Sequence, residues 1–159
     1  MITAVDTNII LDVLIPGEPF GESSKKLLDH HLSKGKLIIC EIVFAELAAK
    51  FPSEDELKLF LTNTGMRLVC SNENSLFLAG SRWTKYARKG AKKPFSCSSC
   101  GHAFEVTCPQ CSAKPTKRLH VLGDFFIGAH ALVQADCILS RDIGVYKTYF
   151  DDLQVIGSI

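Results

Sequence analysis

Four acidic residues stand where carboxylates commonly do chemistry in α/β proteins. Asp6 and Asp142 each follow a short apolar run that is expected to form a buried strand. Ligands of parallel sheets bind beyond the carboxyl ends of the strands, so both acids fall where a site is expected. Glu46 and Asp124 lie in apolar segments that are expected to be helices buried against that sheet. Buried acids are usually paired or bound to metal, because an unpaired buried charge costs several kcal/mol.

Each of these acids taken alone also has an ordinary structural explanation. Asp124 could be an acid in the first turn of a helix, where the helix dipole favours negative charge. Glu46 could simply face solvent. The functional interpretation therefore depends on all four acids meeting at one place.

Four of the seven cysteines form two Cys-x-x-Cys pairs within residues 91–119, a basic segment interrupted by prolines. Seven residues separate the pairs, and each pair offers two thiolates to one ion. Four thiolates complete a tetrahedral zinc shell, which makes such a site structural rather than catalytic. A redox role is the weaker alternative, because two matched pairs are harder to explain that way. The sequence therefore predicts an inserted zinc-ribbon subdomain with Cys97, Cys100, Cys108 and Cys111 as ligands.

Positive charge is concentrated in residues 82–118, which hold nine basic residues against a single acid, Glu105. A basic stretch in an otherwise acidic chain is the footprint of a polyanion partner, although a solvated helix face has the same composition. The insert could hold nucleic-acid phosphates, but zinc ribbons also mediate protein contacts. The candidate nucleic-acid-binding residues are Lys92, Lys93, Lys114, Lys117 and Arg118.

The composition fits one globular domain. The chain has 159 residues, of which 47% are apolar and 22% charged, within the usual size of a single domain. Its apolar runs are too short to cross a membrane. Its start lacks the basic and then apolar pattern of a signal peptide, so a cytoplasmic protein is expected. Cys40, Cys70 and Cys137 adjoin short apolar runs and are predicted to be buried thiols.

Strand-like and helix-like segments alternate outside the insert. This alternation predicts a parallel β-sheet flanked by helices, an α/β fold. Ser53 begins a capping-box pattern, Asn72 or Asn74 can cap the long helix that follows, and Ser23 or Ser24 an earlier one. Predicted strands span 2–5, 36–40, 66–70, 137–140 and 153–156; predicted helices span 9–14, 23–33, 41–51, 53–62, 72–89, 123–134 and 143–150.

The acidic segments together resemble the PIN-domain nucleases, and within them the VapC-like toxins. The resemblance rests on Ala4–Asp12, the helix carrying Glu46, Gly123–Ile127 and Ile138–Tyr146, in that order and spacing. It covers residues 1 to about 157 apart from the insert, and implies one PIN-like domain over 1–159 with the zinc ribbon at 91–119.

Carried over residue by residue, the resemblance implies that Asp6, Glu46, Asp124 and Asp142 are the catalytic, metal-binding quartet. Ser140 matches the small hydroxyl residue that accompanies the quartet, and Asn8 matches a polar position after the first acid. Asp12 belongs to the same motif but is expected to face solvent, as are His30 and His31. His120 is a further candidate for substrate contact.

The expected chemistry is metal-assisted hydrolysis of RNA phosphodiesters. Hard cations held by carboxylate oxygens neutralise phosphate charge and lower the pKa of a bound water. An oxygen-only ligand set favours magnesium or manganese over zinc at the quartet.

The leading hypothesis is an endoribonuclease, either the toxin of a toxin–antitoxin pair or a housekeeping RNA-processing enzyme. Typical VapC-like toxins lack the cysteine insert, which bears on the toxin role and not on the nuclease chemistry. The resemblance implies RNA as substrate, with an antitoxin and a second copy of the chain as protein partners to test. Two alternatives stay open: a non-catalytic RNA- or protein-binding module, and a structure-specific DNA nuclease.

Overall fold

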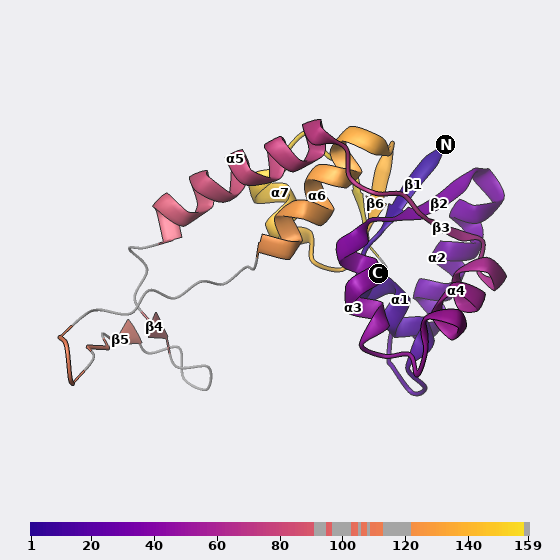
Figure 1. Cartoon of the computed structure of the whole chain (residues 1–159), viewed down its shortest axis with the longest axis horizontal. Helices are drawn as coiled ribbons and strands as arrows, with labels where there is room; N and C mark the ends of the chain where they lie inside the picture. The colour runs from indigo at the N-terminus through magenta and orange to yellow at the C-terminus, as the bar shows by residue number, and fades with distance from the viewer. Residues whose placement is uncertain (91–94, 97–102, 105, 108, 113–121, 158–159) are drawn as a thin grey trace.

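The computed structural model describes residues 1–90, 95–96, 103–104, 106–107, 109–112 and 122–157. A five-stranded sheet with the order β3-β2-β1-β6-β7 lies at its centre (Figure 1). Every neighbouring pair in this sheet is parallel, which confirms the predicted α/β class. The strands are β1 (Ile2–Val5), β2 (Lys36–Ile39), β3 (Met66–Leu68), β6 (Cys137–Leu139) and β7 (Val155–Ile156).

Seven helices connect the strands within the described residues. Helices α2 and α4 pack near β2 and β3, whereas α6 packs on β1 and β6, and α5 lies alongside α6 (Figure 1). The helices are α1 (Thr7–Leu14), α2 (Gly21–Lys34), α3 (Glu41–Ala48), α4 (Glu54–Asn63), α5 (Glu73–Gly90), α6 (Leu122–Gln134) and α7 (Ile143–Tyr149).

The central strands are rich in apolar residues because helices cover both faces of the sheet. Side chains from both faces of β2, including Leu37, Ile38 and Ile39, are buried. Strands of this kind carry continuous apolar runs rather than an alternating pattern. None of the described helices is long and apolar enough to cross a membrane.

The capping residues decide where several helices begin. The Ser53 side chain accepts a hydrogen bond from the Glu56 N–H at the start of α4, as the capping-box pattern predicts. Asn72 accepts the Ser75 N–H before α5. The prediction for α2 is wrong: Phe20 precedes this helix, and the Ser24 side chain turns into the protein.

The predicted exposure of His31 and the predicted burial of Cys70 are also wrong. His31 is buried, and its Nδ1 lies 3.1 Å from the Thr3 hydroxyl beneath the sheet. It shares the inward face of α2 with Ser24 and Leu28, which lie seven and three residues earlier. Cys40 and Cys137 are buried thiols as predicted, but Cys70 is exposed because β3 is an edge strand that ends at Leu68.

The carboxyl ends of β1 and β6 lie together. The Asp6 N–H donates to the Leu139 carbonyl at 3.0 Å, which continues the β1–β6 ladder by one residue. The Ser140 N–H donates in the same way to Ile156 on the other side. This edge therefore brings Asp6 beside Ser140, although they are 134 residues apart in sequence.

Candidate functional site

Asp6 is the buried centre of the site. Three side-chain donors converge on its Oδ2 atom: the Ser140 hydroxyl at 2.6 Å, the Asn8 amide at 2.9 Å and the Tyr146 hydroxyl at 3.1 Å. The Asn8 amide also lies 3.2 Å from the Ser140 hydroxyl. Ser140 follows β6, Asn8 lies in the first turn of α1, and Tyr146 comes from α7. Three separate elements thus fix the orientation of this one carboxylate.

The pKa values of Asp6 and Tyr146 are shifted by the charges of the other predicted acids. Burial raises the pKa of Asp6; hydrogen bonds from Ser140 and Tyr146 oppose that shift, and the charge of Glu46 adds to it. Burial and the charges of Asp6, Asp124 and Asp142 hold the pKa of Tyr146 well above its usual value. Charges act in this way only over short distances. The charge of Glu46 therefore acts on Asp6, and those of Asp124 and Asp142 act on Tyr146, which donates to Asp6.

Glu46 is held by Thr7 rather than by burial. The Thr7 hydroxyl, at the start of α1, donates to Glu46 Oε2, which ties α3 to α1 directly beside Asp6. Glu46 itself is exposed, so the expectation that it would be buried against the sheet is wrong. Asp124 lies in the first turn of α6 and is half-buried.

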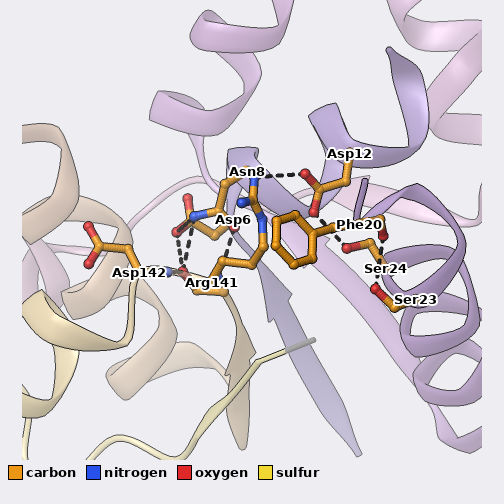
Figure 2. Close-up of polar contacts among 9 residues, drawn as sticks. Asp6, Asn8, Asp12, Phe20, Ser23, Ser24, Arg141 and Asp142 are labelled. Carbon is orange, nitrogen blue, oxygen red and sulfur yellow. Dashed lines mark hydrogen bonds and ion pairs between the residues drawn. The ribbon is translucent and has the colours of Figure 1, made fainter. Parts of the chain in front are cut away.

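Asp142 immediately precedes α7, and its N–H donates to the Ser140 hydroxyl at 3.0 Å. Its carboxylate points away from Asp6 (Figure 2). In the part of the chain that the structure describes, no three histidine, cysteine or acidic side chains already form a metal-binding group. The carboxylates of these neighbouring acids therefore stay apart, because like charges repel one another.

Asp12 does not face solvent, contrary to the prediction. Its side chain is 1% exposed and accepts hydrogen bonds from the Arg141 guanidinium and the Ser24 hydroxyl, both at 2.7 Å. The guanidinium carbon lies 4.7 Å from the centre of the Phe20 ring, so Arg141 is also stacked on that ring (Figure 2). A buried aspartate needs such a partner, because an uncompensated charge is costly inside a protein.

Most of the predicted insert lies outside the described residues. This holds for Cys97, Cys100 and Cys108, for His120, and for the basic residues Lys92, Lys93, Lys114, Lys117 and Arg118. Cys111 is described and exposed. Two short antiparallel strands, β4 (Phe95–Ser96) and β5 (Ala103–Phe104), flank the first Cys-x-x-Cys pair in sequence.

Sequence reasoning missed Tyr146, Arg141 and Thr7. Tyr146 belongs to the Ile138–Tyr146 segment of the resemblance but was assigned no role, although it lies four residues after Asp142, about one helical turn further along. Thr7 and Arg141 likewise lie in the Ala4–Asp12 and Ile138–Tyr146 segments, and each adjoins a predicted site residue in sequence. Their partners, Glu46 and Asp12, are 39 and 129 residues away.

The fold has solved relatives. VapBC-1 from nontypeable Haemophilus influenzae is similar with a TM-score of 0.64 and 19% identity, covering 99% of this chain and 98% of that chain. VapBC2 from Rickettsia felis, bound to a promoter DNA fragment, gives 0.62 and 17%, again covering 99% and 98%. DNA-bound VapBC from Salmonella typhimurium gives 0.61 and 13%, covering 100% and 99%. At these identities the likeness concerns the fold.

At the level of sequence, comparison with curated proteins found no match. The PIN domain family, in contrast, matches residues 3–105, a stretch that includes Asp6 and Glu46 and ends before Asp124 and Asp142. That match spans more than half of the 159 residues. The chain therefore belongs to the PIN domain family.

Proposed function

We propose that this chain is a magnesium- or manganese-dependent endoribonuclease whose site is formed by Asp6, Glu46, Asp124 and Asp142. The proposal rests on one observation: three side chains donate hydrogen bonds to Asp6 Oδ2, and the charges of the other acids act on Asp6 and on Tyr146. Membership of the PIN family supports it, because PIN domains are generally nucleases.

The donor set fits a hard divalent cation. All four acids offer carboxylate oxygens, which suit magnesium and manganese better than zinc. Three donors occupy Asp6 Oδ2, whereas no side chain among the described residues donates to Oδ1. The Thr7 backbone N–H also hydrogen-bonds this carboxylate, and we propose Oδ1 as the oxygen that Asp6 offers to a cation. When bound, the cation supplies neutralisation of phosphate charge and a more acidic water.

The protein's own residues hold this ligand set in place. Ser140, Asn8 and Tyr146 fix the plane of the Asp6 carboxylate, and Thr7 orients Glu46. The pKa of Tyr146 is raised by burial and by the neighbouring carboxylates, so its hydroxyl stays a donor to Asp6. Fixed hydrogen bonds of this kind orient the ligands of metal sites and tune their affinity.

Four variants test the carboxylate mechanism: Asp6→Asn, Glu46→Gln, Asp124→Asn and Asp142→Asn. Each should retain the circular dichroism spectrum of the wild type and lose cleavage of single-stranded RNA in manganese. Asp29→Asn is a matched control, because Asp29 pairs with Lys25 on the exposed face of α2. Full activity in EDTA, or in Asp6→Asn and Asp142→Asn, would refute the mechanism. Cleavage of DNA in preference to RNA would favour the DNA nuclease alternative.

A toxin-like role with an antitoxin partner is the more specific part of the proposal. The similar solved structures are VapBC complexes, together with FitAB bound to a DNA fragment, and these are toxin–antitoxin complexes. A short neighbouring reading frame whose product binds the chain and inhibits cleavage would support this role. RNA cleavage without any such partner would support the housekeeping role instead. Light scattering of the purified chain tests the homodimer.

The insert is proposed to be a structural zinc ribbon. Its support is the spacing of Cys97, Cys100, Cys108 and Cys111, together with the β4–β5 pairing around the first two of them. Four thiolates at such spacing complete a tetrahedral zinc shell. Its basic residues are proposed to bind RNA phosphates, which would place substrate contacts outside the acid site.

A further inference from the structure

The carboxylate of Asp142 has no direct anchor from its helix. Asp142 stands at the N-cap of α7, but its side chain makes no capping hydrogen bond, and the residue is exposed. The hydrogen bonds of the structure therefore fix the backbone that carries this carboxylate. That backbone is the turn Ser140–Asp142 between β6 and α7.

Two side chains of the Asp6 group hold the turn from one side. The Ser140 hydroxyl accepts the Asp142 N–H at 3.0 Å, and Asn8 Oδ1 accepts the Arg141 N–H at 3.1 Å. The Ile143 N–H closes the turn onto the Arg141 carbonyl at 3.0 Å. The turn is thereby linked to the same residues that orient Asp6.

The Arg141 side chain holds the turn from the other side. It donates to Asp12 Oδ1 at 2.7 Å and lies over the Phe20 ring at 4.7 Å (Figure 2). Asp12 is fixed in turn by Ser24, so the anchor comprises residues of α1, α2 and the segment between them. Because the Asp12 carboxylate is buried, moving Arg141 away would leave the negative charge of Asp12 unpaired inside the protein, which is costly.

We propose that Arg141 is a positioning residue, which fixes the Ser140–Asp142 turn against Asp12 and Phe20 and so holds the backbone of Asp142 beside Asp6, from where its side chain can turn toward a bound cation. This inference rests on the proposed function, since it requires Asp142 to bind a cation. It assigns Asp12, Ser24 and Phe20 a role in the site through Arg141. The competing role is direct binding of an RNA phosphate by Arg141, and the measurement of Mn²⁺ affinity without RNA separates the two.

The test measures Mn²⁺ binding directly, by the loss of the free-ion electron paramagnetic resonance signal, in full-length wild type and variants. Arg141→Lys keeps the charge opposite Asp12 but loses the planar group that stacks on Phe20. Phe20→Leu removes the stacking surface and leaves the ion pair intact. Partners that orient metal ligands typically change affinity by about 10- to 100-fold. We expect Arg141→Lys to weaken Mn²⁺ binding by about 10-fold, and Phe20→Leu to weaken it less.

Arg82→Lys is the matched control. Arg82 also stacks on a ring, Phe150 at 4.9 Å, and also binds an aspartate, Asp152 at 3.1 Å, at the far end of α7 from Asp142. It should lower the melting temperature about as much as Arg141→Lys does and leave Mn²⁺ affinity unchanged. This control separates positioning from a general loss of stability.

A double-mutant comparison identifies Asp142 as the residue through which Arg141 acts. In an Asp142→Ala background the other three acids remain, and adding Arg141→Lys should change Mn²⁺ affinity no further. Equal Mn²⁺ affinity in wild type and Arg141→Lys would overturn the inference, as would weakened RNA binding with unchanged Mn²⁺ affinity. A wild type that binds no Mn²⁺ would instead overturn the proposed function, and the inference with it.

Discussion

Removing the Tyr146 hydroxyl, by Tyr146→Phe, perturbs the site by a single atom. This hydroxyl is buried and donates to Asp6 Oδ2 at 3.1 Å. The ring keeps its packing against Phe150, so the substitution leaves little more than a lost hydrogen bond. Hydrogen bonds to charged groups contribute about 1.5–3 kcal/mol. Because Ser140 and Asn8 still donate to the same oxygen, we expect the lower value, about 1.5 kcal/mol.

That loss is large enough to measure by thermal unfolding. For a chain of this length, 1 kcal/mol corresponds to about 2–4 °C, so the metal-free variant should melt about 3–6 °C below the wild type. Mn²⁺ affinity should also fall by about 10-fold, since Asp6 would be less firmly oriented. Circular dichroism melts in EDTA, followed by Mn²⁺ titration, measure the two effects separately.

Thr148→Val is the control for this experiment. It removes an exposed hydroxyl of the same helix, α7, which donates to the Gly144 carbonyl. Surface changes of this kind usually stay within about 0.5 kcal/mol. If Tyr146→Phe matched Thr148→Val in both melting temperature and Mn²⁺ affinity, the hydroxyl would have no role in holding Asp6.

The other predictions concern the insert and the buried histidines. Purified protein should contain one zinc ion per chain by metal analysis, and Cys97→Ser with Cys108→Ser should remove it while leaving the sheet folded. Neutralising Lys92, Lys93, Lys117 and Arg118 should weaken RNA binding and flatten its log–log salt dependence by about 0.7 per lost phosphate contact; an unchanged slope would favour a protein-docking role. Burial lowers the pKa values of His31 and His130, an effect that Glu41 opposes at His130. The contribution of both neutral histidines to folding stability is therefore fully present above pH 6.5. The free energy of unfolding should drop as the pH falls below that value, because the unfolded chain then binds protons that the folded chain does not. Urea titrations at about pH 7.5 and 5.5 measure this drop, which should shrink in the His31→Gln, His130→Gln double variant.

The elements of this fold could be predicted because their signals are local. Apolar runs marked the central strands, and the Ser53 and Asn72 caps marked the starts of α4 and α5. Strand ends were less well predicted, since Cys40 serves as the N-cap of α3 rather than as the last residue of β2. The order of the strands in the sheet was not predictable from local patterns.

The candidate site was predictable only where its residues end strands or lie in motifs. Asp6 and Ser140 met this condition, and the structure brings them within hydrogen-bonding distance. The burial of Asp12 was not predictable, because it depends on an ion pair with Arg141, 129 residues away. His31 was predictable in principle, since it follows Leu28 at helical spacing.

The packing of α5 against α6 has a consequence for how this chain tolerates changes in length. Chain segment 91–121 begins and ends at two helices that already touch, with the rings of Tyr86 and Phe125 only 5.4 Å apart. The entropy of closing a loop grows only with the logarithm of its length. Lengthening an ordinary five-residue connection to this segment therefore costs about 1.6 kcal/mol. Connections of very different length between these two helices are therefore compatible with nearly the same stability of the sheet and the helices that cover it.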